Sequence, residues 1–441
     1  MKAAFFLFRV EVDYSNNFFN SHLRTAVFQP PTINIKHMKK NYFSLFILLC
    51  LFLASAYPCT TAVISGKATP DGRSMIWKLR DTDNMTNSMR YFNDGKYVYL
   101  GLVDSKDIKG EHVWGGSNSA GFAIMNSASF NVNQKDTTSF KDQEGAFMKL
   151  ALQTCATLEE LEQLLNNRPR PMGLGAHFGV IDAQGGAAFY EVNNHSWTKF
   201  DANTAPEGYV LRTNYSETGT PDVGYGFIRR QTATKIFGDA EKENKINVET
   251  ILQKFSRCFY HPVFGVDYRR KYESGEYVTD FISSDDMITR HGSASNMVIQ
   301  GVKKGELPDM NTVWVQVGFP ETSVSLPLWV RGGENMPMLL QYDKELKNSQ
   351  LNQYAMEWKN AAYPIGRSDG YHYLNMTKLI NPDKTGYIQR IERVEEEIFS
   401  LTEEKLKQWR KRTPSSLEIE KYYLFLNEKV TRFYVTENAE K

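Results

Sequence analysis

The chain has 441 residues, enough for one large domain or two ordinary ones, and 41% of them are hydrophobic, which permits a sizeable core. Lysine and arginine number 52 against 51 aspartates and glutamates, so the formal net charge is +1. This balance gives no reason to expect a nucleic acid or an anionic membrane surface as the main partner. An aromatic content of 13% favours a packed, sheet-rich protein.

The first feature along the chain is the apolar run FSLFILLCLFLA at residues 43–54. It is too short to span a membrane comfortably. Two lysines precede it and Ala54-Ser55-Ala56 ends it, a pattern typical of a secretory signal peptide. We interpret residues 1–37 as a mis-assigned upstream extension and residues 38–56 as the signal peptide, and we expect an exported protein, periplasmic or extracellular. The alternative is a signal anchor with a cytoplasmic tail.

The predicted signal peptidase cut follows Ala56 and leaves Tyr57-Pro58 ahead of Cys59. Residues 57–58 would then be a short propeptide, removed either by attack of Cys59 on its own upstream carbonyl or by a dipeptidase that cuts after X-Pro. Three cysteines remain once Cys50 has left with the signal peptide, and this odd number predicts a free thiol.

Short strands follow. TTAVIS (60–65) and SMIWKL (74–79) flank Pro70-Asp71-Gly72, a strong turn signal. Two further hairpins are expected within residues 111–129 and 177–192, each turning near glycine.

Helices are expected between and after these hairpins. The ranges are 144–155, 157–167 behind a capping box at Thr157, 227–238 and 247–257, with later strands at 296–302 and 312–319. Strands in runs and helices in runs indicate an α+β fold rather than alternating βαβ units. We expect one domain over 59–335 and a C-terminal extension over 336–441 that is mostly amphipathic helix from about residue 386.

The first hairpin places charged residues beside Cys59. If its turn centres near Pro70-Asp71, the antiparallel partner of Cys59 lies within a residue or two of Arg80, and Asp83 follows closely. A Cys59 that is the N-terminus carries an amine with a pKa of about 8, low enough to accept the thiol proton. Arg80 would lower the thiol pKa and Asp83 would hold the amine. The alternative is a surface ion pair beside an ordinary strand cysteine.

These residues resemble a known group. Cys59-Thr60 with Arg80-x-x-Asp83 is similar to the cysteine N-terminal-nucleophile amidases, which include choloylglycine hydrolase, penicillin V acylase and the isopenicillin N acyltransferase family. The similarity continues in chain order through NSAGFAIMNSAS, GVIDAQGGAAFYEV, LRTNYSET, FIRRQTATKIF and the closing strands near 292–323. It covers roughly residues 59–330.

The resemblance implies a four-layer αββα N-terminal-nucleophile sandwich and cleavage of a linear amide, or acyl transfer to an amine, through a thioester on Cys59. It implies that Asn214, helped by Asn126, stabilises the oxyanion, and that Arg229 or Arg230 belongs to the site. The spacing from Cys59 to Arg80 is longer than expected for bile salt hydrolases, which favours the acyltransferase-like branch. The tail after about residue 335 matches no part of the family.

Two other interpretations stay open. CTTAVISGKATPDGRSMI also resembles the start of the cysteine dipeptidases, which share fold and nucleophile. A secreted binding protein lipidated on Cys59 is the alternative of another class, although Tyr57-Pro58 is a poor context for lipidation. The scattered histidines lack zinc-ligand spacing, so we expect no metal and no cofactor. The expected partner is a small-molecule amide, without nucleic acid and with membrane contact only through the signal peptide; homo-oligomerisation stays open.

Overall fold

The strand pattern at the start of the catalytic domain folds as a tight antiparallel hairpin around which the rest is arranged. The computed structural model describes residues 59–138 and 141–439, so the predicted signal peptide and propeptide lie outside the described residues. Strands β1 (Cys59–Ile64) and β2 (Met75–Asp81) pair with Cys59 opposite Arg80 and Ile64 opposite Met75. The predicted partner of Cys59 is therefore confirmed.

This hairpin belongs to the first of two antiparallel sheets. The strand order of the first sheet is β10 (Tyr209–Arg212), β1, β2, β14 (Ser293–Gln300), β15 (Thr312–Val317) and β16 (Leu326–Leu328). The second sheet has the order β3 (Asn87–Phe92), β4 (Tyr99–Asp104), β5 (Gly115–Asn118), β6 (Ala123–Ala128), β7 (Ala176–Ile181), β8 (Ala187–Val192) and β9 (Trp197–Asp201). The hairpins predicted within 111–129 and 177–192 are β5–β6 and β7–β8.

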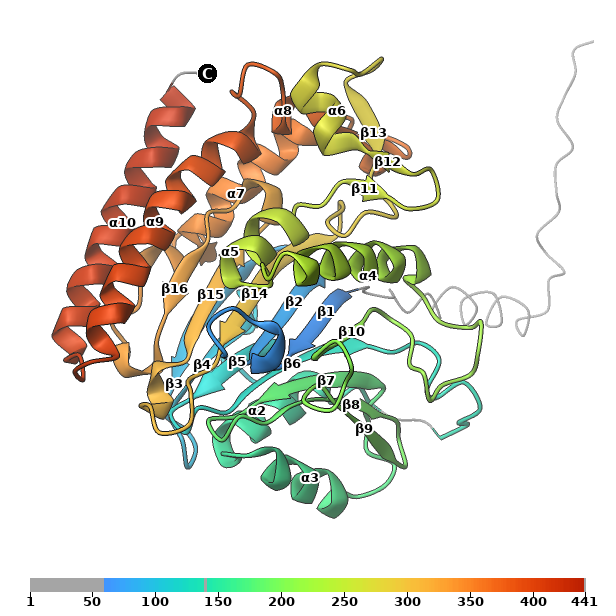
Figure 1. Ribbon diagram of the computed structural model, residues 1–441, viewed down its shortest axis with the longest axis vertical. Helices are drawn as coiled ribbons and strands as arrows, with labels where there is room; N and C mark the ends of the chain where they lie inside the picture. Colours follow the sequence, from blue (N-terminus) through green and yellow to red (C-terminus); the bar gives the residue numbers. More distant parts are fainter. Residues whose placement is uncertain (1–58, 139–140, 440–441) are drawn as a thin grey trace, which may run out of the picture. The chain divides into compact units, whose positions relative to one another are not determined.

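The two sheets pack face to face, and helices cover their outer faces (Figure 1). On the first sheet, alternation sends Trp77 outward against Phe237 of α4 (Phe227–Lys242), with ring centroids 5.9 Å apart. On the second sheet, Phe178 packs against Phe147 of α2 (Glu144–Thr154) at 4.9 Å. The fold is the predicted four-layer αββα sandwich of the α+β class.

The remaining helices complete the outer layers and the C-terminal part. They are α3 (Leu158–Asn167), α5 (Val248–Thr250) with the π-helical turn η3 (Ile251–Phe255), α6 (Tyr268–Ser274), α7 (Gln350–Ala362), α8 (Met376–Leu379), α9 (Tyr387–Trp409) and α10 (Ser416–Ala439). Short 3-10 turns lie at η2 (Gly66–Ala68), η4 (Pro308–Met310), η5 (Pro320–Thr322), η6 (Val330–Gly332), η7 (Met338–Leu340) and η8 (Gly370–His372). Two-stranded ribbons pair β11 (Tyr260–His261) with β12 (Val266–Asp267), β13 (Phe281–Ser283) with β19 (Tyr373–Asn375), and β17 (Tyr342–Asp343) with β18 (Asn348–Ser349).

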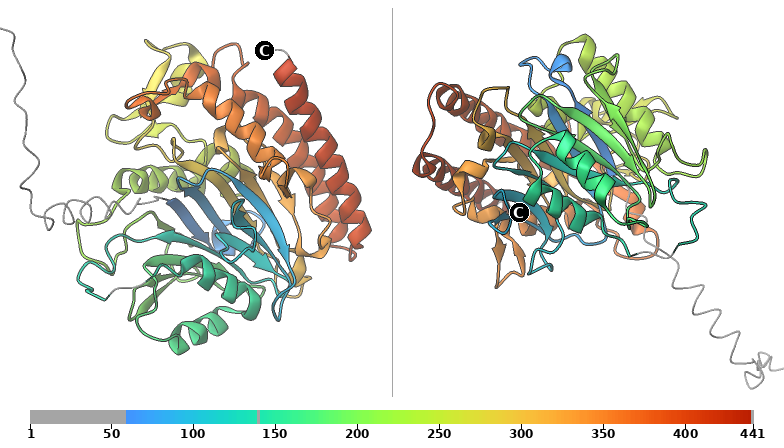
Figure 2. Two further views of the ribbon diagram at one scale, coloured as in Figure 1. Left: turned by 180° about the vertical axis from the view of Figure 1, so that it is seen from behind. Right: turned by 90° about the horizontal axis from the view of Figure 1, so that it is seen from below.

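The two long C-terminal helices lie side by side along the β16 end of the first sheet (Figures 1 and 2). A fully buried ion pair joins Arg257 to Glu395 of α9, with N–O distances of 2.7 and 3.0 Å. Glu395 also accepts hydrogen bonds from the backbone and hydroxyl of Ser325, both at 2.8 Å. The amphipathic helices predicted from the sequence are thus built into the sheet core through a charged contact that hydrophobic periodicity does not reveal.

Within the described residues, no helix is long and apolar enough to cross a membrane. The described cysteines Cys59, Cys155 and Cys258 are all free thiols, and Cys155 is buried among apolar side chains.

Candidate active site

Cys59 is the first residue of β1, and it lies almost fully buried between the two sheets. Strand alternation places its side chain on the inner face of the sheet, the same face as Lys78 and Arg80 of the neighbouring strand β2. Burial is the main influence on the thiol and raises its pKa. The charge of Asp81 adds to that rise, whereas the charges of Lys78 and Arg80 and a backbone hydrogen bond from Asp81 oppose it without reversing it.

The backbone nitrogen of Cys59 is held by a side chain that is distant in sequence. It donates a hydrogen bond of 2.8 Å to Oδ1 of Asn214, which is fully buried just after β10. The Nδ2 group of Asn214 donates to the carbonyl of Ala128 at 2.8 Å, which fixes the orientation of the amide. Asn214 is therefore at the reacting end of β1 as predicted. Its oxygen faces the nitrogen of Cys59, and its role as an oxyanion donor stays a prediction.

Arg229 locks this arrangement from the first turn of α4. Its guanidinium donates to Oδ1 of Asn214 at 2.8 Å, to Oγ1 of Thr60 at 3.0 Å and to the carbonyl of Cys59. Gly226 begins the helix with φ of 84°, and a Cβ there would lie 2.3 Å from the guanidinium, so this close approach requires glycine. Burial lowers the pKa of Arg229, yet an arginine in this place stays charged.

Arg230 points elsewhere. It is half-buried and lies 3.6 Å from the carboxylate of Glu217, whose own side chain is half exposed. Of the two arginines that the sequence left open, the structure brings Arg229 to Cys59 and leaves Arg230 in a peripheral ion pair.

Arg80 lies beside Cys59 and is oriented by polar groups of the second sheet. Its guanidinium donates to Oδ1 of Asn87 at 2.7 Å and lies 2.9 Å from the carboxylate of Asp104. It also stacks over the ring of Trp114, 4.7 Å from the ring centroid. These contacts fix the guanidinium on the inner face as a permanent positive charge.

Lys78, which the sequence motifs did not single out, lies on the same inner face as Cys59 and Arg80. Its ammonium donates to the carbonyl of Trp114 at 2.7 Å and to Oδ1 of Asn126 at 2.5 Å. Burial lowers its pKa to about 8, and Cys59 exerts the largest opposing influence. The sequence could have predicted this placement, because residues two apart on a strand share a face and Lys78 lies two places before Arg80.

Asn126 connects Lys78 to a buried acid on α2. The Nδ2 group of Asn126 donates to Oε2 of Glu144 at 2.7 Å. Burial raises the pKa of Glu144 to about 8, and the nearby Asp142 adds to the rise. The structure thus places Asn126 as a bridge in the chain Lys78–Asn126–Glu144, and its predicted help in stabilising the oxyanion stays a prediction.

The carboxylate predicted from the sequence is exposed. Asp83 lies in the bend after β2, no described bond joins it to Cys59, and its role in holding the amine stays a prediction. The buried carboxylate of the segment is Asp81, whose side chain accepts hydrogen bonds from Arg290 and Ser293. Because strand alternation puts Asp81 on the helix-facing side of the sheet, it lies on the opposite face from Lys78 and Arg80 and supports the strand end from behind.

A buried polar chain underlies the loop that carries Asn214. His177 of β7 lies 2.9 Å from Oγ of Ser127 through Nδ1 and 2.7 Å from Oγ of Ser216 through Nε2. Burial lowers the pKa of His177 to about 3, so the imidazole is neutral and can accept one hydrogen bond while donating another. The chain ties β6 and β7 to the residue two places after Asn214.

The C-terminal extension braces the turn that follows β2. Asn352 of α7 donates to the carbonyl of Met85 at 2.9 Å, and Ser349 donates to the carbonyl of Asn87 at 2.7 Å. Lys359 donates to the carbonyl of His291, next to the strand that contacts Asp81. The extension therefore supports the charged wall of the site although none of these residues contacts Cys59 through a described bond.

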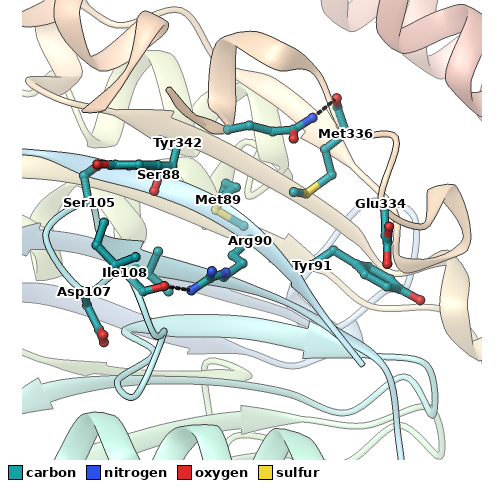
Figure 3. A pocket seen from close by; sticks show the side chains of 12 residues that line it. Ser88, Met89, Arg90, Tyr91, Ser105, Asp107, Ile108, Glu334, Met336 and Tyr342 are labelled. Atoms are coloured by element: carbon teal, nitrogen blue, oxygen red, sulfur yellow. Dashed lines mark hydrogen bonds between the residues drawn. The ribbon is translucent and has the colours of Figure 1, made fainter. Parts of the chain in front are cut away.

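A separate pocket of about 310 Å³ lies along edge strand β3, opposite the segment that carries Glu334, Met336 and Tyr342 (Figure 3). Arg90 lies in its wall and donates to the carbonyl of Ile108 at 2.8 Å. The nucleophile cluster is not part of its lining, so the pocket is distinct from the reacting centre. Among the described residues, no group of three or more histidine, cysteine or carboxylate side chains is arranged to hold a metal ion.

Comparison with known proteins gives a matching family. Residues 68–250 match the family described as acyl-coenzyme A:6-aminopenicillanic acid acyl-transferase. This match confirms the resemblance to cysteine N-terminal-nucleophile amidases that the motifs indicated. No curated protein matches the chain.

Solved structures with some similarity share low identity with this chain. The Caenorhabditis elegans ortholog of N-acylethanolamine-hydrolyzing acid amidase is 14% identical, with a TM-score of 0.37, covering 57% of this chain and 93% of that one. Penicillin V acylase from Agrobacterium tumefaciens is 14% identical, with a TM-score of 0.34, covering 62% and 86%. A mutant conjugated bile acid hydrolase from Clostridium perfringens is 12% identical, with a TM-score of 0.35, covering 62% and 92%.

Proposed function

We propose, from the family match over residues 68–250 and the geometry around Cys59, that this chain is an exported amidohydrolase or acyltransferase acting on a linear amide through a thioester on Cys59. The observation that carries the proposal is the placement of the Cys59 nitrogen. It lies 2.8 Å from a fully buried amide oxygen of Asn214, which Arg229 holds in turn. A strand-end nitrogen fixed this way becomes a positioned base once the peptide bond before it is cut.

The proposed reaction begins with transfer of the thiol proton to the free amine of Cys59. The thiolate attacks the amide carbonyl, and a tetrahedral oxyanion forms, for which the side-chain amides of Asn214 and Asn126 are the proposed donors. The amine returns the proton to the leaving nitrogen, and an acyl thioester remains on Cys59. Water or an acceptor amine then attacks the thioester and regenerates the thiol.

The charges around the thiol support this sequence of steps. Lys78 and Arg80 lie on its side of the sheet, and both lower the free energy of the thiolate. Burial lowers the pKa of Lys78 to about 8, so the contribution of its charge to the thiolate falls above that pH. We therefore expect the nucleophile to be most active where the amine has lost its proton and Lys78 has kept it.

We further propose that the acyl part of the substrate is apolar, on the basis of the aromatic side chains around Asn214. The backbone N–H of Phe130 donates to the carbonyl of Asn214 at 3.1 Å, and the backbone N–H of Asn214 donates to the carbonyl of Tyr225 at 3.2 Å. The rings of Phe130 and Tyr225 lie edge to face. Phe227 stacks on Tyr215 with ring centroids 4.5 Å apart. Tyr225 and Phe227 stay 57% and 42% exposed, which leaves apolar ring surface on the segment that follows Asn214.

The test is a substrate panel with processed protein that begins at Cys59. The panel contains N-acyl amino acids of short and long chain, penicillin V, conjugated bile salts and dipeptides. We expect turnover of at least one N-acyl substrate by the parent protein, a loss of at least about a hundredfold in Cys59→Ala, and a KM increase for long acyl chains in Phe227→Ala. Full turnover by Cys59→Ala would refute the nucleophile, and turnover of dipeptides alone would favour the dipeptidase interpretation.

A further inference from the structure

In the intact chain, the nitrogen of Cys59 is unable to act as a base. It belongs to the peptide bond with the preceding residue, its lone pair is delocalised, and its N–H is a donor to Asn214. The proposed enzyme therefore needs another proton acceptor if Cys59 is to cut that bond itself. Arg229 donates to the carbonyl of Cys59 and, as an arginine, keeps its proton. The other charged groups near the thiol are Lys78, Arg80 and Asp81.

Two of these three groups are unsuited to the task. Arg80 remains protonated and is bound by Asn87 and Asp104. Asp81 points to the opposite face of the sheet, where Arg290 and Ser293 occupy its carboxylate. Neither can accept the thiol proton on the inner face.

Lys78 has the required position. It lies on the inner face, two residues before Arg80 on the same strand. Because Arg80 is paired with Cys59, Lys78 is the diagonal neighbour of Cys59, and a long side chain can reach across this distance. The carbonyl of Trp114 and Oδ1 of Asn126 hold two of its three ammonium hydrogens. Glu144 fixes the other end of Asn126, and this contact helps to set the orientation of the ammonium.

We propose that Lys78 is the general base and acid by which the intact chain cuts its own peptide bond before Cys59. This inference rests on the proposed function, because it takes Cys59 as the nucleophile. Neutral Lys78 accepts the thiol proton, and the thiolate attacks the carbonyl carbon of Pro58. The resulting intermediate expels the nitrogen of Cys59, which takes the proton back from Lys78 and becomes the free amine.

The step leaves a thioester between Pro58 and the sulfur of Cys59. Water attacks this thioester, releases the upstream segment with a carboxylate at Pro58 and returns the thiol. No oxidant, metal or further reactant enters the balance. After the cut, the new amine takes over as base, and Lys78 serves as a positive charge beside the thiolate.

The surroundings of Lys78 suit this use near neutral pH. Its pKa is lowered to about 8 by burial, with Cys59, Glu144 and Asp104 opposing the shift and Arg80 adding to it. These groups come from β1, α2, β4 and β2, the elements packed around the ammonium. The neutral amine that the first step requires is therefore a populated form in the physiological range.

The experiment follows self-cleavage of the purified full chain by intact-mass analysis over time. The variants are Lys78→Met, which has no base, Lys78→Arg, which keeps the charge but holds its proton, and Cys59→Ala. The matched control is Lys67→Met, an exposed lysine in the turn between the same two strands. We expect cleavage before Cys59 in the parent and the Lys67→Met variant, and cleavage at least about a hundredfold slower in both Lys78 variants.

Two results would overturn the proposal. One is an uncut parent chain, which assigns the trimming to another enzyme. The other is cleavage of Lys78→Met or Lys78→Arg at the parent rate, which shows that no proton transfer by Lys78 is needed.

A second form of the full chain carries a cleavage site for a specific protease directly before Cys59. Protease release at this site distinguishes a misfolded variant from a failure of the proposed function. Protease-released Lys78→Met that regains measurable amide turnover shows a folded site and supports a role in the cut. Released Lys78→Met without turnover, despite a parent-like melting temperature, also supports the assignment if its precursor stayed uncut. A released parent chain without amide turnover would refute the proposed function while leaving the cleavage assay informative.

Discussion

Replacing Arg229 by methionine removes the side chain that joins Cys59, Thr60 and Asn214. The carbonyl of Cys59 and the hydroxyl of Thr60 each lose a charged donor in a buried place, and Oδ1 of Asn214 keeps the nitrogen of Cys59. A lost hydrogen bond to a charged group costs about 1.5–3 kcal/mol, so the two oxygens together predict a loss of about 3–6 kcal/mol in the free energy of unfolding. That is a large share of the roughly 5–15 kcal/mol by which domains are stable.

The matched control is Arg230→Met, one residue along the same helix. Its partner Glu217 is half exposed and 3.6 Å away, so we expect a change within about 1 kcal/mol. Urea unfolding measures both variants, and turnover of the best amide substrate is measured under conditions where each is folded. We expect turnover by Arg229→Met to fall about a hundredfold or more, because the guanidinium that fixes both Oδ1 of Asn214 and the carbonyl of Cys59 is lost and the nucleophile is then held less firmly in place. Equal stability and equal turnover in the two variants would refute this account of the site.

Three further predictions concern neighbouring groups. Asp81→Asn should lose stability and turnover because Arg290 loses the negative charge of Asp81, whereas Asp83→Asn should behave like the parent; the reverse order would restore the assignment made from the sequence. Glu395→Gln should lower the free energy of unfolding, measured in urea, by about 3–5 kcal/mol, because Arg257 stays buried without its counter-charge. Glu397→Gln, on the exposed side of α9, is the near-neutral control, and equal unfolding midpoints for the two variants would contradict the role of the buried ion pair. Glu144→Gln should flatten the dependence of melting temperature on pH. In the parent, the native state retains a proton on Glu144 up to about pH 8 that the unfolded chain releases near 4.5, so parent stability falls as pH rises through this window. Parallel curves for parent and variant would contradict the raised pKa.

The local parts of the fold and site could be predicted from the sequence. The turn Pro70-Asp71-Gly72 fixes the register of the first hairpin, and this register is enough to place Arg80 opposite Cys59. Strand alternation would also have placed Lys78 with them and Asp81 on the other face. The Arg-x-x-Asp pattern of the similar family instead indicated Asp83. Asp83 lies beyond the end of β2, where strand alternation no longer predicts the face of a side chain.

The remaining contacts depend on packing between distant segments. Glu144 reaches Asn126 only because α2 covers the second sheet, and Arg229 reaches Cys59 only because α4 begins directly after Gly226 beside β1. The helical pattern of α9 predicts an amphipathic helix, but the ion pair of Glu395 with Arg257 joins residues 138 positions apart. Neither periodicity nor spacing contains such information in a single sequence.

The most direct test of the central claim is the N-terminus of the active protein. Active material is labelled with a thiol-directed substrate analogue, digested and analysed by mass spectrometry. We predict that the labelled peptide begins at Cys59, with a free amine and the label on its sulfur. Active, labelled protein that begins at Tyr57 or earlier would contradict the free-amine mechanism, because the nitrogen of Cys59 would still be an amide.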